Sequence, residues 1–293
     1  MRRLVLLGCL PALLLGLSVG CGGTQESAPS GAPSVPAASP TAPPPEPATV
    51  TDAEPSVTLE VWFLRGEKLF LATRDVEKAP RVAAAALEAL LAGPSEAEAA
   101  AGVSTAIPEG ARLLGVTVED GIAAVDLGAE YESGGGSLSM TARLAQVVYT
   151  LTQFPTVQGV RFELEGRPVE VFSGEGIVLD APVERKDYDD LFPAIVVASP
   201  GIGARAGNPV HIAGQANVFE ANVNVRILDA QGREIVRSFV TASCGTGCLG
   251  DFSADVPYEV AEEQAGMIQL HSDDAAGTGT LPNLVEIPVV LTP

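Results

Sequence analysis

The 293-residue sequence has little of what catalytic and nucleic-acid-binding proteins are usually built from. It contains one tryptophan, two histidines and four cysteines, and only 17 basic residues against 37 acidic ones. The formal net charge of −20 argues against binding to nucleic acid or broad contact with anionic lipid, because both require basic patches. The acidity by itself is explained equally well by solubility or by electrostatic steering of a partner.

Motifs for nucleotides, nucleophiles and metals are also missing from the chain. "ESGGGS", residues 132–137, lacks the lysine of a phosphate-binding loop, and "GIGARAG", residues 201–207, misses the spacing of a dinucleotide fingerprint. "HSDDAAGTG" places Asp273 and Asp274 in one loop without the alternating acids of a calcium loop. We therefore predict no catalytic residue, no cofactor and no metal ligand.

Residues 1–20 have the pattern of a secretory signal peptide. Two arginines precede the apolar stretch 4–17, which is too short and too interrupted for a membrane-spanning helix of about 20 residues. "SVGC" follows and ends at Cys21. This order resembles the lipobox of bacterial lipoproteins, which implies acylation of Cys21 and cleavage before it. Two acyl chains are enough for stable anchoring.

One residue departs from the lipobox pattern. Ser18 stands where that family prefers leucine, valine or isoleucine. The residues before Cys9 match the lipobox pattern better, but cleavage there would leave an apolar region too short to engage a membrane. We therefore predict lipidation at Cys21, and the alternative is a plain secreted protein with an incidental thiol.

The composition changes after Cys21. Residues 22–56 carry nine prolines among small and polar residues and almost no large apolar side chains, so they cannot form a core. We predict that residues 21–56 are a disordered tether. The protein is then held at the extracytoplasmic side of a membrane in the cell envelope, with the lipid anchor as its sole membrane contact.

Residues 57–179 alternate between strand and helix patterns and predict a small α+β domain, with helices packed on a sheet. Pro80 and Gly93 bracket a helix, and Ser95 with Glu98 forms a capping box for a second, short one. Every polar residue of this junction thus has a backbone role. The remaining predicted elements are strands at 57–64 and 68–74, a hairpin turning at 120–121, a helix over 138–154, and a hairpin turning at 165–166.

Residues 180–192 are charged and contain two prolines, which is typical of a linker. Beyond them, residues 193–293 contain seven short strand patterns separated by turns. This rhythm predicts an all-β immunoglobulin-like sandwich.

Three segments of the first domain, "LEALLAGPSEAEAAAGVSTAIPEGARLLGV", "DGIAAVDL" and "ARLAQVVYTLTQFPTVQGVRFELEGRPV", together resemble the GerMN domain. This is a sporulation and spore-germination module common in bacterial envelope lipoproteins. "ASPGIGARAGNPVHIAGQANVFEANVNVRILDAQGREI" and "GDFSADVPYE" resemble the immunoglobulin-like domain of bacterial spore germination. No catalytic residues are attributed to the GerMN family, so the resemblance implies assembly or adhesion, and it leaves self-association into a homo-oligomer open.

The segment "SCGTGC" places Cys244 and Cys248 four residues apart. Outside the cytoplasm such a pair suggests a disulfide that pins a strand-end loop. The alternative is a metal site completed by His211 and His271, which lack the close spacing of histidine ligands.

Trp62 is out of phase with the apolar face of its predicted strand, and so packs on the other face of the sheet or serves as a contact point. These observations predict a non-enzymatic, lipid-anchored envelope protein whose two modules contact envelope proteins or cell-wall glycan, in sporulation, germination or envelope complex assembly. The alternative is a peptidoglycan- or carbohydrate-binding module, or an envelope hydrolase.

Overall fold

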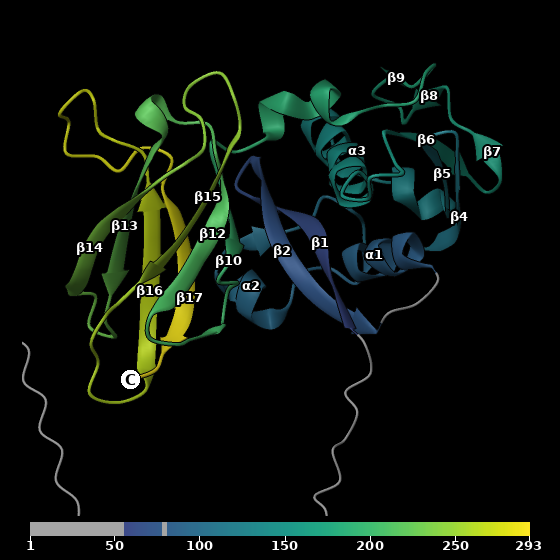
Figure 1. Ribbon diagram of the computed structural model, residues 1–293. Helices are drawn as coiled ribbons and strands as arrows, with labels where there is room; N and C mark the ends of the chain where they lie inside the picture. Colours follow the sequence, from purple (N-terminus) through teal and green to yellow (C-terminus); the bar gives the residue numbers. More distant parts are fainter. Residues whose placement is uncertain (1–55, 78–80) are drawn as a thin grey trace, which may run out of the picture. The chain divides into compact units, whose positions relative to one another are not determined.

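The computed structural model describes residues 56–77 and 81–293 (Figure 1). The predicted signal peptide, Cys21, the tether up to residue 55 and Pro80 lie outside the described residues. Among the residues that are described, no helix is both long enough and apolar enough to span a bilayer. Two hydrophobic cores are present, one drawn mainly from residues 61–191 and the other from residues 195–291.

The first core is covered by a three-stranded sheet of order β2-β1-β3. The long strands β1 (Ser56–Arg65) and β2 (Lys68–Glu77) form an antiparallel hairpin, and the two-residue β3 (Val103–Ser104) pairs with the end of β1. Gly66 adopts a φ of 60° in the turn between them. The predicted strands are confirmed, and both are longer than predicted.

Two helices follow the hairpin, α1 (Val82–Leu91) and α2 (Glu96–Ala100). Gly93 takes a left-handed φ of 80° between them, as glycine does at helix ends. Ser95 caps α2 with both hydrogen bonds of a capping box in place. The predicted helix end and helix start at this junction are confirmed, and both serve the backbone.

A second sheet has the order β4-β5-β6-β7. β4 (Leu113–Glu119) and β5 (Ile122–Leu127) form the predicted hairpin, with positive φ at Asp120 and Gly121. β6 (Gly159–Leu164) pairs with β5 in parallel, which the sequence pattern did not indicate. The predicted hairpin at 165–166 is present, but its second strand is only β7 (Arg167–Pro168). The chain then forms a separate pair, β8 (Val171–Phe172) and β9 (Ile177–Val178).

Helix α3 (Ser137–Leu151) connects β5 to β6 and is preceded by the short 3-10 helix η1 (Ala129–Glu132). The helical spacing of residues 138–154 predicts one apolar face, and its members are buried, but so is every residue from Ala142 to Leu151. The predicted face consists of Met140, Leu144, Val147, Val148 and Leu151. The polar members are used to fix the helix on β1. Gln146 donates from Nε2 to the carbonyl of Trp62 (3.0 Å), and Thr150 Oγ1 accepts from the Trp62 amide (3.1 Å).

Trp62 belongs to the packed interior. Its side chain is 2% exposed and lies against the rings of Tyr149 and Phe192, with ring centroids 5.2 and 5.6 Å away. Its Nε1 atom is buried without a hydrogen-bond partner among the described residues. Of the two roles left open for Trp62, packing is the one observed.

The predicted linker, 180–192, is more ordered than a plain linker. It contains the 3-10 helix η2 (Arg185–Leu191), in which Tyr188 and Leu191 are buried. Arg185 donates from Nε to Thr152 Oγ1 (2.6 Å) at the end of α3. The segment is therefore docked on the first core by Arg185, Tyr188 and Leu191, although its charged composition suggested an open linker.

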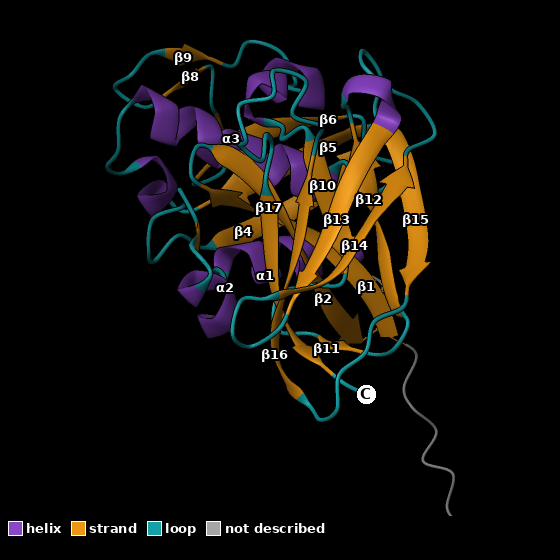
Figure 2. Ribbon diagram, turned by 90° about the vertical axis from the view of Figure 1, so that its left-hand side faces the viewer, coloured by secondary structure: helices purple, strands orange, loops and turns teal. Residues whose placement is uncertain are grey.

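The second core lies between two sheets, ordered β10-β12-β15 and β11-β17-β16-β13-β14 (Figure 2). All seven predicted strands are present, and a two-residue strand is added before the second of them. The chain thus has an α+β domain followed by an all-β immunoglobulin-like sandwich. The strands are β10 (Ile195–Ser199), β11 (Arg205–Ala206), β12 (Val210–Ala216), β13 (Asn222–Leu228), β14 (Glu234–Thr241), β15 (Gly250–Val256), β16 (Gln264–His271) and β17 (Val285–Leu291).

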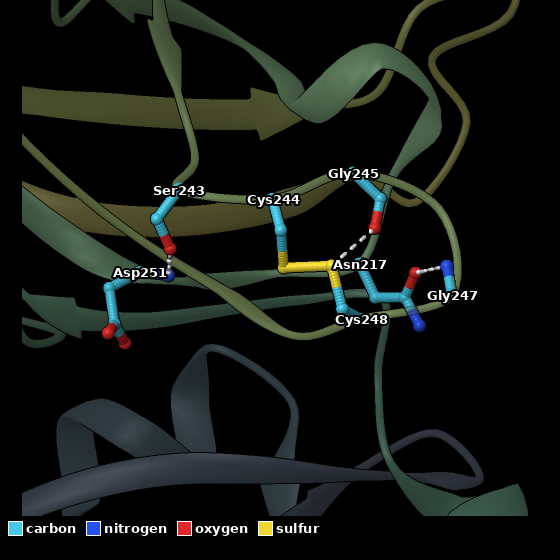
Figure 3. The surroundings of a disulfide bond; sticks show 7 residues. All are labelled: Asn217, Ser243, Cys244, Gly245, Gly247, Cys248 and Asp251. Carbon is cyan, nitrogen blue, oxygen red and sulfur yellow. Dashed lines mark hydrogen bonds between the residues drawn. A yellow bond between two sulfur atoms is a disulfide. The ribbon is translucent and has the colours of Figure 1, made fainter.

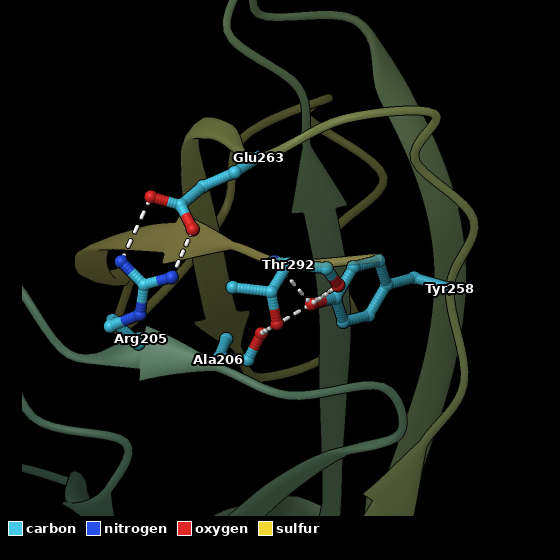
Figure 4. Close-up of polar contacts among 5 residues, drawn as sticks. All are labelled: Arg205, Ala206, Tyr258, Glu263 and Thr292. Atoms are coloured by element: carbon cyan, nitrogen blue, oxygen red, sulfur yellow. Dashed lines mark hydrogen bonds and ion pairs between the residues drawn. The ribbon is translucent and has the colours of Figure 1, made fainter.

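The end of the last strand is held by a buried tyrosine (Figure 4). Tyr258 donates its hydroxyl to the carbonyl of Ala206 (2.5 Å) and accepts from the amide of Thr292 (3.0 Å). An ion pair between Arg205 and Glu263 lies beside these contacts. The Tyr258 contacts therefore hold the backbone after β17 against that of β11.

Candidate functional site

The acidic residue at the helix junction is engaged in structure. Glu98 accepts the amide of Ser95 (2.7 Å) and both guanidinium nitrogens of Arg74 (2.8 and 2.6 Å). Burial alone would raise the pKa of Glu98, but the hydrogen bonds from Arg74 and Ser95 outweigh it and lower that pKa. Glu98 is therefore held as a carboxylate, unsuited to donating a proton. The capping partner was predicted from sequence, whereas Arg74 was not, because it comes from a different element.

The glycine-rich loop at 132–137 presents its carbonyl groups to a cation of the same chain. Arg143 is buried and donates to the carbonyls of Ala106 (3.0 Å), Ser133 (3.1 Å) and Gly134 (3.2 Å), and also to that of Tyr131. A phosphate loop would instead turn its amides toward an anion. The arrangement fixes the entry to α3.

The four residues considered for a metal site have separate contacts. Cys244 and Cys248 are joined by a disulfide. His211, half exposed on β12, places Nδ1 2.8 Å from Asp255, and His271 places Nδ1 2.9 Å from the carbonyl of Ser272. Among the described residues, no three histidine, cysteine, aspartate or glutamate side chains are grouped so that they could hold a metal ion.

Asp273 and Asp274 are adjacent in sequence but act in different places. Asp273 accepts the side-chain amides of Asn222 (3.2 Å) and Asn224 (2.6 Å). Asp274 accepts from the hydroxyl of Thr278 and the amide of Gly279, and the backbone hydrogen bonds of this turn lower its pKa. The two carboxylates therefore do not converge on a common site that could bind a calcium ion.

The disulfide closes residues 244–248 into a tight loop of the sandwich, which lies beside Asn217 of a neighbouring turn (Figure 3). Asn217 accepts the amide of Gly247 (3.0 Å), and Ser243 accepts the amide of Asp251 (2.9 Å). Gly245 approaches so closely that an added Cβ would lie 3.0 Å from the amide nitrogen of Ala221. The disulfide loop and the turn at 217–221 are therefore packed on each other.

That turn has an unusual backbone. Glu220 and Ala221 both adopt left-handed φ angles, 54° and 58°, within the 3-10 turn η3 (Phe219–Ala221). Two consecutive residues with a Cβ in this region cost free energy and persist only where the surroundings enforce them. Here the enforcing groups are the pinned loop and the first residues of β13.

The strained turn carries an outward aromatic side chain. Phe219 is 60% exposed, and Leu249, at the end of the disulfide loop, is 41% exposed. We call residues 217–221 and 243–249 together the loop end. The sequence indicated the pair of cysteines, but no signal in it indicated that the phenyl ring of Phe219 faces solvent.

Comparisons with known proteins identify both domains. The family model Germane, described as sporulation and spore germination, matches residues 60–170. The family model Gmad2, described as an immunoglobulin-like domain of bacterial spore germination, matches residues 194–278. Both resemblances expected from the sequence are confirmed, and both families are non-catalytic. No curated protein matches the chain.

Solved structures from Bacillus subtilis are also similar. The first GerMN domain of the sporulation protein GerM is 20% identical, with a TM-score of 0.37 over 45% of this chain and 99% of that one. The tandem GerMN domains of GerM are 13% identical, with a TM-score of 0.39 over 71% of this chain and 64% of that one. The two family matches support a domain architecture in which a region similar to sporulation and spore germination domains precedes one similar to the immunoglobulin-like domain of bacterial spore germination.

Proposed function

We propose that this chain is a non-enzymatic, lipid-anchored protein of the cell envelope that binds a partner protein through the loop end during sporulation, germination or envelope complex assembly. The observation that carries the proposal is the outward Phe219, held by two strained residues in a turn pinned by the disulfide loop. The domain architecture supports the biological setting, because both matched families are named for sporulation or germination.

A rigidly presented aromatic ring suits a binding surface. Aromatic side chains dominate the energetics of protein interfaces, and the entropy lost on binding is smaller when the loop is already fixed. At the loop end the fixing contacts are the Asn217–Gly247 hydrogen bond and the close packing of Gly245 on Ala221. Strain at a surface turn is a feature of binding and switch sites.

The charges around the loop end indicate the chemistry of the partner. Glu220 is exposed next to Phe219, and Asp251 is exposed where the disulfide loop ends. An apolar pocket bordered by basic side chains would complement this surface, because complementary charge raises the association rate and excludes wrong partners. The partner protein is therefore expected to be basic at its contact site.

A pull-down tests the contact. The full-length, membrane-extracted protein is cross-linked in envelope extract, alongside Phe219→Ser and the matched variant Phe239→Ser, which removes an equally exposed phenylalanine from β14. We expect Phe219→Ser to capture at least about tenfold less of the partner than the wild type does. Equal capture by the wild type and Phe219→Ser would overturn the loop end as the contact surface.

The lipid anchor has a separate test. The intact mass of the membrane-extracted protein should equal that of the chain from Cys21 with its acyl groups, and Cys21→Ser should release the protein from the membrane fraction. A mass that includes residues 1–20, or unchanged membrane association of Cys21→Ser, would remove the anchor from the proposal.

The rival function is wall hydrolysis. Release of soluble product from purified wall fragments by the wild-type protein would replace the contact function with an enzymatic one. Activity that persists after treatment with a metal chelator would then direct attention to paired carboxylates.

A further inference from the structure

A second surface of the sandwich gathers polar side chains around an exposed ring. Asn224 on β13 lies opposite Phe239 on β14 and opposite His271 on β16, and Arg226 lies opposite Arg237. Directly opposite residues of antiparallel strands point to the same side of the sheet. The residues that alternate with them along β13 are fully buried in the core, and those along β14 are half-buried or buried, so these five residues lie on the outer side. We call them the outer face.

The outer face contains a hollow rather than a flat surface. A pocket of about 190 Å³ is lined by Asn224, Arg226, Arg237, His271 and Leu281. Leu281 belongs to the loop between β16 and β17, which forms the wall of the pocket. The volume suits one sugar ring, and it is smaller than the roughly 300 Å³ at which pockets for larger ligands begin.

The outer face places two arginines side by side in an acidic region. Residues 193–293 contain four arginines and no lysine against eleven acidic residues, and two of the four arginines are this cross-strand pair. Glu234 bridges them, accepting from Nε of Arg226 (2.5 Å) and from Nε of Arg237 (2.8 Å). The hydrogen bonds from Arg237 and Arg226 lower the pKa of Glu234 to about 2. The two guanidinium groups and Glu234 together carry +1, and the carboxylate of Asp273, hydrogen-bonded to Asn224, lies next to them.

Such a pair has a cost. Like charges directly opposite each other destabilise a sheet, and one carboxylate relieves only part of the repulsion. Arg237 is 74% exposed at its side chain, and its Nη1 atom makes no hydrogen bond among the described residues. A carboxylate of a ligand would fit there, because it would complete the neutralisation and accept from the guanidinium group.

Two side chains beside the arginines have a fixed orientation and an acceptor atom that remains available to a ligand. Asp273 can only accept, so it turns the amide nitrogen of Asn224 toward itself and leaves the Asn224 Oδ1 atom outward. His271 faces the carbonyl of Ser272 through Nδ1, so Nδ1 carries the proton and Nε2 of the neutral ring is an acceptor. Over residues 56–77 and 81–293, neither Oδ1 of Asn224 nor Nε2 of His271 makes a hydrogen bond. Hydroxyl groups are the matching donors.

Phe239 does not line the pocket, but it offers an apolar platform next to it. Its side chain is 63% exposed directly beside Asn224. The face of a phenyl ring is electron-rich and attracts the weakly positive C–H groups of a sugar ring, which can lie flat on it. Donors for a carboxylate, acceptors for hydroxyls and a flat apolar ring thus occur together.

We propose that the outer face binds a saccharide that carries a carboxylate. The carboxylate lies against Arg237, the hydroxyls donate to Asn224 and His271, and the sugar ring rests on Phe239. The presence of such a ligand near the protein rests on the extracytoplasmic location in the proposed function, where wall glycan is available. An acidic peptide would use the arginines but would leave the two acceptors and the platform unused.

Titration calorimetry with two sugars tests the proposal on the full-length, detergent-extracted protein. N-acetylmuramic acid and N-acetylglucosamine share a ring and differ in the lactyl carboxylate. We expect saturable binding of the first, at least about tenfold weaker binding of the second, and loss of affinity as salt is raised. A short poly-glutamate peptide serves as the carboxylate without a sugar, and we expect no binding of it at matched concentration.

Variants locate the site. Arg237→Gln lowers the charge of the cluster to zero, and Phe239→Ala removes the platform; each should weaken N-acetylmuramic acid binding by about tenfold. Glu234→Gln raises the charge to +2 and should tighten binding. Arg205→Gln, an exposed arginine of the same domain paired with Glu263, is the matched control and should bind like the wild type.

Three results would overturn the proposal: equal binding of the two sugars, unchanged affinity in both Arg237→Gln and Phe239→Ala, or binding of poly-glutamate alone. The outcome is separate from that of the contact function. Phe219→Ser should retain sugar binding, whereas Phe239→Ala should retain the partner protein.

Discussion

Arg74 on β2 holds both carboxylate oxygens of Glu98 on α2, at 2.8 and 2.6 Å, and Glu98 at the same time completes the cap of its own helix. Glu98→Ala should therefore lower the free energy of unfolding by about 2 kcal/mol, through loss of the cap and of the partner of Arg74. Urea unfolding at pH 7 measures the change. Glu96→Ala, an exposed residue of the same helical turn, should stay within about 0.5 kcal/mol of the wild type.

The same pair predicts a pH dependence. The pKa of Glu98 is lowered in the folded state, so its contribution is complete above the unfolded pKa of about 4.3 and is lost as the pH falls toward the folded value. Between pH 5 and pH 3 the free energy of unfolding should therefore fall more steeply for the wild type than for Glu98→Ala. Parallel stability curves for the two proteins would contradict this assignment.

Arg143 should be the residue on which the entry to α3 depends most. Arg143→Met leaves the buried carbonyl of Tyr131 and the part-buried carbonyls of Ala106, Ser133 and Gly134 without their donor, and should cost about 2 kcal/mol. Limited proteolysis should then cut the loop at 133–136. Arg161→Gln, on the exposed side of β6, is the control and should change neither measurement.

Gly214 marks a close approach inside the sandwich. A Cβ at this position would lie 2.0 Å from the carbonyl oxygen of Val196 on β10 and 2.7 Å from the ring of Phe252 on β15. Gly214→Ala should therefore destabilise the protein by about 3 kcal/mol through overpacking. Gly207→Ala, where nothing lies within 4 Å, should be tolerated, and equal melting temperatures for the two variants would refute the clash.

The disulfide should contribute modestly to stability. Cross-linking Cys244 to Cys248 closes a loop of five residues, for which chain entropy gives about 2 kcal/mol. Reductant should lower the wild-type free energy of unfolding by that amount and should leave the double variant Cys244→Ser, Cys248→Ser unchanged. An equal response of both proteins to reductant would show that the pair does not stabilise the fold.

Local signals account for most of what the sequence predicted. The capping box at Ser95, the Asp120–Gly121 turn and the seven strand patterns of the sandwich are all found where expected. Each depends on residues within a few positions of one another, and backbone preferences act over that range. The apolar face of α3 was also predicted, but the burial of its polar face was not.

The missed features all depend on contacts between distant segments. The parallel pairing of β5 and β6, the Arg74–Glu98 pair and the docking of η2 join residues that no local pattern relates. The outer face could not be predicted for the same reason. Asn224, Phe239 and His271 become neighbours only through strand register, and their separate strand patterns gave no sign of it.

The parallel alignment of β5 and β6 constrains the order in which the first domain can assemble. Parallel neighbours cannot be joined by a tight turn, so the chain must travel back along the sheet, and residues 128–158 make that return with α3 in the middle. The β4–β5 hairpin can close by itself, whereas β6 gains its place only after the helix has docked. A defect in α3 would therefore leave a half-built sheet with β5 as an open edge, a species prone to aggregate.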